Sequence, residues 1–366
     1  MEIVARATPA ITERRGVAAV PLIPQNPYQQ LLYRELAELG VPLEADARLR
    51  IGWLLRSRSR IAALHIHWPQ GLYRHRGHAS SAVSWSRLLL LAVRLGAARL
   101  LGYRILWTVH QLYPHEQEHP ALDRAASRLL AAAAHALLVH DGSTAEQVSD
   151  LRGAGRKVRR VPHGSYVGVY PPGRRRDDVR TELGLQPSTV VFLAFGHVRG
   201  YKDLDILLDG LAAAEIDDAA LVVAGLPLDS ASAALVADRA AADPRIVPLL
   251  EFVPNERVAE LFGAADAAVV SRGDGGTSGA LILALSLGTP VVVADSPSYS
   301  ELIGYGRAGW LFAAGKPSSL ARALESAAAD RDGIRARARA ARAAADSLSW
   351  AEAARLTSAL ILPEPR

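Results

Sequence analysis

Short apolar runs alternate with segments of helical periodicity along the whole of this chain. In the first half, the candidate strands span 17–23, 61–67, 104–110, 135–140 and 158–162, with helical patterns at 28–39, 83–101 and 120–134. The second half repeats the pattern, with candidate strands at 190–195, 219–225, 245–250, 264–271 and 290–295 and helices over 318–345 and 349–361. Strands that alternate with helices form parallel sheets covered on both faces. The sequence therefore predicts two doubly wound α/β domains.

The length of 366 residues also favours two domains. The stretch 169–188 holds three prolines, a basic run and no strand pattern, so we interpret it as the interdomain connection, with Arg174, Arg175 and Arg176 as a solvated patch. The predicted parts are an N-terminal domain over 1–169, a linker over 170–188, a C-terminal domain over 189–346, and a terminal helix over 347–366. That last helix could pack back on the N-terminal domain.

The composition restricts the chemistry that the chain can perform. It has no cysteine, which excludes disulfides, zinc–thiolate sites and cysteine nucleophiles. The net charge of +5 suits phosphorylated ligands or an anionic membrane surface and is too small to imply nucleic acid by itself. Residues 1–16 lack the apolar core of a signal peptide, so we expect a cytoplasmic protein. The apolar stretch 88–106 is interrupted by arginines and predicts a helix followed by a strand rather than a membrane span.

A basic loop follows the apolar run 190–195. The run ends at Gly196, the loop presents Arg199 and Lys202, and Asp203 opens a segment with helical spacing. Helix N-termini attract anions, and arginine and lysine beside one favour a phosphate or a diphosphate. The loop therefore predicts a site for a nucleotide-type ligand.

A second loop in the same half, within 271–295, is rich in glycine and lies between a strand and a helix. Thr277 or Ser278 is expected to cap that helix, and the backbone N–H groups of Ser278 and Gly279 could hold a second phosphate edge or a sugar. Such a turn is a weak signal alone, and it gains weight from the basic loop in the same domain.

Taken together, these motifs resemble the donor domain of GT-B glycosyltransferases, near family 4 of the retaining enzymes. The resemblance rests on FGHVRGYKDLD with TSGALILALSLGTPVVVAD. The segments NPYQQLLYREL, HIHWPQ, WTVHQLYPHE and VPHGSY, with Ser349-Trp350, resemble a bacterial branch that includes β-mannosyltransferases of the GDP-mannose type. The resemblance covers nearly the whole chain. It implies two Rossmann-like doubly wound domains facing across a cleft.

The resemblance also implies roles for individual residues. The C-terminal domain would bind a nucleotide-diphosphate sugar, with Gly196, Arg199 and Lys202 at the diphosphate. Residues Glu251, Phe252 and Val253 fall where the family contacts the base. The N-terminal domain would bind the acceptor, and His110 matches a histidine at the end of a strand that faces the donor sugar.

The sequence departs from the family pattern at two glutamates. Family members usually carry them eight residues apart, whereas this chain has Gly275 and Leu283 at those positions. Asp274 is a candidate for the first, and Thr277 or Ser278 for the ribose contact of the second. The retaining stereochemistry is therefore open, and so is whether the acceptor nucleophile is oxygen or sulfur.

An inverting enzyme needs a general base, for which His110 and Glu116 are the candidates. GT-B enzymes generally act without a metal, and we expect no cofactor beyond the nucleotide-sugar co-substrate. Asp203-Leu204-Asp205 formally reads as a D-x-D metal motif, but its place at a helix start favours capping. No pair of histidines shows convincing ligand spacing beside a carboxylate.

Several polar and aromatic residues follow the first strands of the N-terminal half and are candidates for the acceptor site: Asn26, Tyr28, His67, Trp68 and Gln70. Helix capping by Asn26 and a packing role for His67 are the competing interpretations. His65 and His67 alternate along a strand, and we expect them on opposite faces.

The sequence thus predicts a glycosyltransferase that moves a hexose-type sugar, with a GDP-sugar favoured as donor. The acceptor is either a lipid-linked saccharide or a soluble specialised metabolite. For a lipid-linked acceptor, residues 73–76 and 88–106 could form an apolar and basic surface for peripheral contact with the inner membrane face. The alternatives are another GT-B sugar-nucleotide enzyme such as an epimerase, and a non-catalytic protein that binds anionic ligands. We expect no nucleic-acid partner, because no module of that kind is recognisable.

Overall fold

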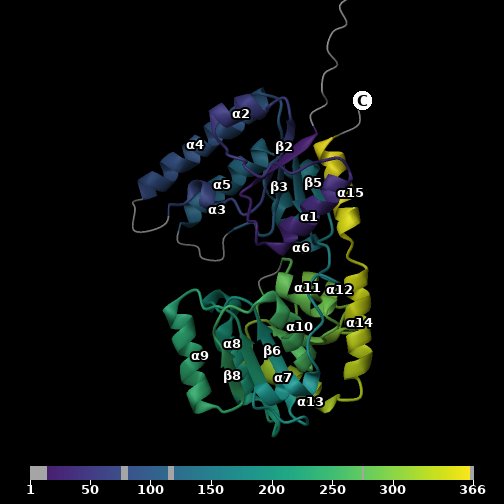
Figure 1. Ribbon diagram of the computed structural model, residues 1–366. Helices are drawn as coiled ribbons and strands as arrows, with labels where there is room; N and C mark the ends of the chain where they lie inside the picture. Colours follow the sequence, from purple (N-terminus) through teal and green to yellow (C-terminus); the bar gives the residue numbers. More distant parts are fainter. Residues whose placement is uncertain (1–14, 76–80, 114–118, 274–275, 363–366) are drawn as a thin grey trace, which may run out of the picture. The chain divides into compact units, whose positions relative to one another are not determined.

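The computed structural model describes residues 15–75, 81–113, 119–273 and 276–362, and the chain divides into two compact units (Figure 1). The N-terminal unit comprises 1–140, 144–162 and 350–366. The C-terminal unit comprises 141–143 and 163–349. Each unit is an α/β domain with its own parallel sheet, which confirms the predicted fold class.

The sheet of the N-terminal unit has five parallel strands in the order β1-β2-β3-β4-β5. The strands are β1 (Gly16–Val20), β2 (Ile61–Ile66), β3 (Arg104–Thr108), β4 (Ala136–Val139) and β5 (Val158–Arg160). The first four are buried almost throughout, as expected for strands covered on both faces. Each strand lies within or close to its predicted range.

The helices of this unit connect and cover the strands. They are α1 (Pro27–Glu38), α2 (Ile51–Ser57), α3 (Gln70–Tyr73), α4 (Ser81–Leu100) and α5 (Pro120–Ala133), with α6 (Gly142–Ser149) and the 3₁₀ turn η1 (Gly155–Lys157) after β4. The stretch 88–106 is the end of α4 followed by the start of β3, as predicted. The last helix, α15 (Trp350–Ile361), packs against α1, and Arg104 at the start of β3 donates to the Leu360 carbonyl at 2.6 Å.

The sheet of the C-terminal unit has six parallel strands in the order β11-β10-β9-β6-β7-β8. They are β6 (Val190–Phe195), β7 (Ala219–Ala224), β8 (Ile246–Leu249), β9 (Ala267–Val270), β10 (Val291–Ala294) and β11 (Gly309–Phe312). Strand β11 is absent from the predicted set. It is four residues long and lies at the edge of the sheet, where it pairs only with β10. A run that short has no periodicity that distinguishes it from a loop.

The helices of the C-terminal unit are α7 (Arg176–Glu182), α8 (Leu204–Ala213), α9 (Ser230–Ala242), α10 (Asn255–Ala264), α11 (Gly279–Ser286), α12 (Pro297–Leu302), α13 (Pro317–Ala329) and α14 (Ile334–Asp346), with the 3₁₀ turn η2 (Gly200–Lys202). The predicted helical tail over 318–345 is two helices, because the segment around Asp330 and Gly333 interrupts it. The apolar core lies between the sheet and helices α8 and α13.

The segment 170–188 differs from the predicted solvated linker. It contains α7, which packs against α10 within the C-terminal unit. Arg174 pairs with Glu260 at 2.8 Å and with Glu182 at 2.6 Å, and Arg176 pairs with Asp266. Arg174 is exposed, as expected of a solvated patch, but it is also ion-paired, and Arg176 is half-buried. Their acidic partners, Glu182, Glu260 and Asp266, all come later in the sequence, so the run alone does not reveal them.

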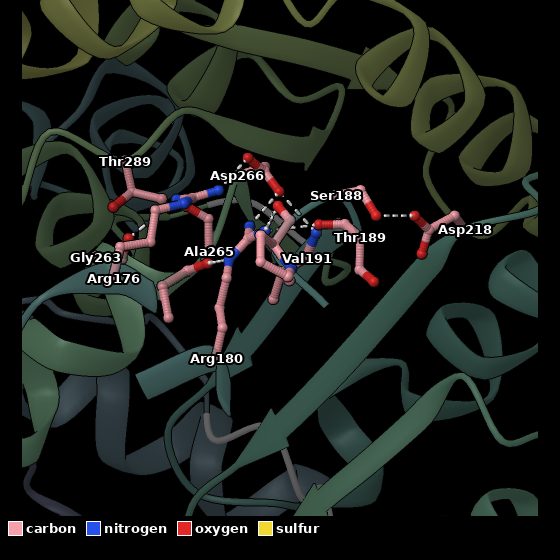
Figure 2. A network of polar contacts seen from close by, with 12 residues as sticks. Arg176, Arg180, Ser188, Thr189, Val191, Asp218, Gly263, Ala265, Asp266 and Thr289 are labelled. Carbon is pink, nitrogen blue, oxygen red and sulfur yellow. Dashed lines mark hydrogen bonds and ion pairs between the residues drawn. The ribbon is translucent and has the colours of Figure 1, made fainter. Parts of the chain in front are cut away.

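A buried arginine at the end of α7 ties this segment to the sheet (Figure 2). Arg180 donates to Asp266 at 2.7 Å and to the carbonyls of Ala264, Pro187 and Thr189 at 2.8–3.0 Å. Asp266 also accepts from the backbone N–H of Val191 at 2.8 Å. Because Val191 belongs to β6, this network fixes the strand whose opposite end carries the basic loop.

Candidate functional site

Two glycines shape the backbone where β6 and β7 end. Gly196 follows β6 with φ of 103°, and Gly225 follows β7 with φ of 145°, both in the region that favours glycine. A Cβ on Gly225 would lie 2.2 Å from the carbonyl oxygen of Gly196, and one on Gly196 would lie 2.9 Å from Nζ of Lys202. Glycine at both positions therefore lets the basic loop lie close against the strand ends.

The basic loop brings three cations together at the end of β6. Lys202 closes the turn η2, and Arg199 immediately precedes that turn. Desolvation, followed by the charges of Arg272 and Arg199, lowers the pKa of Lys202 to about 8. No carboxylate in the described part of the chain forms an ion pair with Lys202. A cluster of positive charges that includes a desolvated lysine is an arrangement that binds a diphosphate.

Arg272 is the member of this cluster to which the sequence analysis gave no role. It follows β9, which pairs directly with β6, so the loops after the two strands meet at one edge of the sheet. The hydroxyl of Ser271 donates to the Lys202 carbonyl at 2.6 Å and joins the loops. The position of Arg272 between a strand end and a glycine-rich loop was the available signal.

The glycine-rich loop leads into α11. Ser278 caps this helix, since its hydroxyl accepts from the Leu281 N–H at 3.3 Å, and Thr277 instead donates to Asp141 at 3.0 Å. Of the two capping candidates, Ser278 is therefore the cap. Leu283, which stands where the family has its second glutamate, is buried in the core. Asp274 and Gly275 lie outside the described residues.

The other predicted donor contacts differ in exposure. Gly279 is the exposed first residue of α11, and a Cβ there would lie 3.8 Å from the Tyr166 hydroxyl. Glu251 and Phe252, between β8 and α10, are exposed, with Phe252 at 72%, and Val253 is half-buried. An aromatic ring left exposed beside a strand end offers a face on which a base could stack.

Asp203 departs from the expected capping role. It precedes α8 with a left-handed backbone (φ 53°), and its side chain makes no capping hydrogen bond to the helix. The described residues contain no group of three or more His, Asp or Glu side chains placed to hold a metal ion.

A chain of hydrogen bonds runs through the predicted acceptor region of the N-terminal unit. The Tyr33 hydroxyl lies 3.0 Å from Nδ1 of His65 and 2.7 Å from Nε2 of His67. The chain continues from His65 Nε2 to the Thr108 hydroxyl at 2.7 Å, and from His67 Nδ1 to His110 Nε2 at 3.2 Å. His65 in β2 and His67 directly after it point to the same side, with ring centroids 4.2 Å apart. The expectation of opposite faces is wrong, because residues two apart in a strand share a face.

Burial keeps the inner part of this chain uncharged. Desolvation lowers the pKa of His65 to about 3 and holds the pKa of His67 well below its usual value. A neutral imidazole has one donor and one acceptor nitrogen, and the Tyr33 hydroxyl has a single proton. The bonds must therefore point in a consistent direction, so that in a neutral His110 ring Nδ1 is either protonated or a hydrogen-bond acceptor.

Aromatic rings surround the outer end of this chain. Trp68 stacks on His110 with centroids 4.3 Å apart and planes 8° from parallel. Tyr28 is buried and makes edge contacts with Trp68, His110 and Trp350. Tyr28 therefore packs edge-on against these rings from a buried position, while Trp68 and His110 are half-buried.

The remaining acceptor candidates have mixed outcomes. Asn26 caps α1, because its side chain accepts from the Gln29 N–H at 3.3 Å, so the competing interpretation holds. Gln70 is the half-buried first residue of α3. Glu116 lies outside the described residues. His110 thus remains as the candidate base whose surroundings are visible.

Comparison with known sequences gives a consistent result. Residues 175–346 match the family described as glycosyl transferases group 1. The chain is 28% identical over 297 residues to GDP-mannose:glycolipid 4-beta-D-mannosyltransferase of Xanthomonas campestris pv. campestris, covering 78% of this chain and 75% of that protein. It is 27% identical over 318 residues to D-inositol 3-phosphate glycosyltransferase of Nocardia farcinica, covering 83% and 62% of the two chains.

Solved structures share the fold. The chain resembles HepE from Anabaena, solved in complex with UDP and glucose, with a TM-score of 0.73 at 14% identity over 94% of this chain and 98% of that one. It also resembles sucrose-phosphate synthase from Thermosynechococcus elongatus, with a TM-score of 0.70 at 18% identity over 95% and 98% of the two chains. At such identities the likeness shows the GT-B fold alone.

Proposed function

We propose that this chain, a GT-B glycosyltransferase with a glycosyl transferases group 1 domain, transfers a hexose-type sugar from a GDP-sugar to an acceptor nucleophile. The cluster of Arg199, Lys202 and Arg272 at the end of β6 is the observation that carries this proposal. The C-terminal unit binds the donor, and the N-terminal unit binds the acceptor.

The cation cluster acts on the leaving group. Glycosyl transfer breaks the bond between the sugar and the diphosphate, so negative charge grows on the departing diphosphate as the transition state forms. Fixed cations at that position stabilise the transition state more than the ground state, which lowers the barrier. Because these side chains supply the neutralising charge, we propose that the reaction needs neither a metal ion nor another cofactor.

The choice of a GDP-sugar rests on similarity to a GDP-mannose enzyme and not on a residue that would recognise the guanine base. The Xanthomonas protein is named as a GDP-mannose enzyme, and this chain aligns with 75% of it. We assign the base to the region of Glu251, Phe252 and Val253, where the exposed ring of Phe252 supports stacking. Thr277, Ser278, Gly279 and Asp274 are assigned to the ribose and sugar.

The acceptor is proposed to bind in the region of His67, Trp68 and Gln70. His110 is the proposed general base, in the arrangement where its Nε2–H donates to His67 and its Nδ1 is unprotonated. Glu116 is the second candidate for that role. The Xanthomonas protein is named for a glycolipid acceptor, which favours a lipid-linked saccharide over a soluble metabolite and a cytoplasmic enzyme at the inner membrane face.

Isothermal titration calorimetry with GDP, UDP, ADP and TDP tests the donor assignment. We expect measurable binding of GDP and at least tenfold weaker binding of the other three. Arg199→Ala, Lys202→Ala and Arg272→Ala should each weaken GDP binding about tenfold or more, because each removes a charge at the diphosphate. Guanosine, which lacks the diphosphate, should bind all variants alike.

Arg322→Ala is the matched control, because Arg322 is an exposed arginine of α13 in the same unit. It should leave GDP binding unchanged. Tighter binding of another nucleotide would replace GDP as the donor class, and no nucleotide binding at all would contradict the proposal. Unchanged GDP affinity in the three cluster variants would remove the diphosphate assignment.

A further inference from the structure

Helix α4 presents two apolar faces, of which only one is covered. Its buried face contributes to the core of the N-terminal unit through Leu88, Leu91, Leu95 and Ala98. Large apolar side chains also stand on the side away from the core, and they are exposed: Val83, Trp85, Leu89, Leu90, Val93 and Leu100. Leu89 is 68% exposed and Leu100 is 91% exposed. A helix at the surface of a water-soluble domain normally carries polar residues there.

These exposed side chains form one continuous stripe. Residues 85, 89, 93 and 100 recur at the spacing that keeps side chains on one face, at about 3.6 residues per turn. No charged residue interrupts the stripe. Arg87 and Arg94 fall at one border between the exposed and buried faces, and Arg99 falls at the other. An apolar face with arginines along both borders is the pattern of a helix that lies in the plane of a membrane interface.

Helix α2 extends this surface. It packs against α4, and the two helices lie together in the N-terminal unit (Figure 1). Ile51 and Leu55 of α2 are exposed, and so are Arg56 and Arg58 near its end. Exposed apolar side chains thus occur on both of these packed helices, and together we call them the α2–α4 face.

The charge of the surrounding residues indicates what kind of partner this face would bind. The sequence contains no acidic residue between Asp46 and Glu116, whereas arginines recur throughout that stretch. Among the described residues, the arginines of this stretch pair with acidic residues from other parts of the chain: Arg60 pairs with Glu44, and Arg74 pairs with Asp123. The stretch of chain that supplies the α2–α4 face is therefore apolar with only cationic charged residues of its own.

We propose that the α2–α4 face docks this protein on an anionic lipid surface, with α4 lying in the interface plane. The apolar stripe would enter the boundary between headgroups and acyl chains, and the bordering arginines would reach anionic headgroups. A second copy of the chain fits less well, since pairing two such faces would bring like charges together. The proposal deepens the proposed function, on which its link to a lipid-linked acceptor rests.

The alternative that α4 crosses a membrane conflicts with its packing. Among the described helices, α4 is long and apolar enough to do so. Its leucines at 88, 91 and 95, however, belong to the same core cluster as Trp107 of β3 and Leu130 of α5. Insertion across a bilayer would withdraw them from that core. Docking in the interface plane uses only the side chains that are already exposed.

Vesicle co-sedimentation of the purified full chain tests the proposal. We expect binding to vesicles of phosphatidylcholine with phosphatidylglycerol, and at least tenfold weaker binding to phosphatidylcholine alone. The triple variant Trp85→Ser, Leu89→Ser, Val93→Ser should reduce binding to the anionic vesicles at least tenfold. Arg94→Gln should reduce it about fivefold, an effect that shrinks as salt is raised.

Leu89→Ser and Leu39→Ser form a matched pair, because Leu39 at the end of α1 is also exposed, at 47%, but lies outside the α2–α4 face. Only Leu89→Ser should weaken vesicle binding. Both exchanges affect exposed side chains, so circular dichroism should show unchanged thermal midpoints.

Equal vesicle binding by the triple variant and the unmodified chain would overturn the proposal. Absence of vesicle binding, together with a dimer in sedimentation velocity that the triple variant abolishes, would identify the face as a self-association interface instead. GDP titration without vesicles is measured on the same samples. Vesicle binding without GDP binding would contradict the proposed donor but not this inference, and the reverse result would contradict this inference alone.

Discussion

The phenolic hydroxyl of Tyr33 bridges two buried imidazoles, at 2.7 Å from Nε2 of His67 and 3.0 Å from Nδ1 of His65. Tyr33 comes from α1, His65 from β2, and His67 directly follows β2, so the contact joins the helix to this strand and its end. His67 in turn contacts His110. Through this chain, Tyr33 influences which nitrogen of His110 carries the proton, and it is a positioning residue for the proposed base.

Tyr33→Phe tests this role. The exchange keeps the ring and leaves two buried imidazole nitrogens without their shared partner, so we expect the free energy of unfolding to fall by about 1–3 kcal/mol. If the chain also sets the protonation of His110, kcat should fall about tenfold, its pH profile should shift, and GDP affinity should not change. Loss of stability with an unaltered kcat and pH profile would reduce Tyr33 to a packing role.

Arg180→Ala should destabilise the C-terminal unit by about 3 kcal/mol. The exchange removes four hydrogen bonds at 2.7–3.0 Å and leaves the carbonyls of Ala264, Pro187 and Thr189 without this donor (Figure 2). Urea denaturation followed by intrinsic fluorescence measures the change. The control is Arg175→Ala, because Arg175 is exposed, and its effect should stay within about 0.5 kcal/mol. Similar losses in both variants would show that the network contributes little.

The sequence predicted the fold well because the strands of a parallel sheet are buried runs that periodicity reveals. Strand β6 matches its predicted range of 190–195, and the helix–strand reading of 88–106 is correct. Where the prediction failed, the partner was distant in sequence. Arg174 and Arg176 belong to a run of arginines that shows no acidic partner until the fold brings Glu260 and Asp266 to them.

The candidate site shows the same division. The basic loop with Arg199 and Lys202 can be recognised from the local sequence, because its cations lie between a strand and a helix. Arg272 joins it only because β9 pairs with β6 in the sheet, a strand order that a single sequence does not specify. Tyr33 falls within the helical pattern predicted over 28–39, and nothing in that pattern separates a tyrosine that packs from one that bonds two histidines.

The buried histidines predict a loss of stability in acid. Since the pKa of His65 is lowered from 6.5 to about 3 by burial, the unfolded chain binds more protons than the folded chain between those two values. The contribution of His65 to the free energy of unfolding is then complete above pH 6.5. It falls as the pH decreases below 6.5, by up to about 1.4 kcal/mol per pH unit. The pKa of His67 is lowered in the same direction, so it adds to the slope.

Urea denaturation at pH values between 7.5 and 4.5 measures this slope, because the range begins above the unfolded pKa of 6.5 and ends above the folded pKa of about 3. His65→Gln keeps a hydrogen-bonding side chain but removes one titrating group. The variant is expected to start from a lower stability at pH 7.5 and to lose less of it on acidification than the unmodified chain does. Parallel curves for the two proteins would mean that His65 does not carry the predicted linkage.

Lys202 predicts that donor binding depends on pH in the alkaline range. Its pKa is lowered from 10.5 to about 8 in the free protein, mainly by desolvation and then by Arg272 and Arg199. A bound diphosphate favours the charged form and raises that pKa, so above pH 8 binding must take up a proton. GDP affinity should therefore be constant below pH 8 and fall above it, by up to about tenfold per pH unit.

Lys202→Arg provides the comparison, because arginine stays charged throughout this range. Calorimetric titration with GDP at pH 7.5, 8.0, 8.5 and 9.0, values that bracket the lysine pKa, should show falling affinity and proton uptake for the unmodified chain. The same titration should give a nearly flat profile for the arginine variant, even if its affinity is lower overall. Equal pH dependence in the two proteins would assign the titration to another group and contradict a direct contact between Lys202 and the diphosphate.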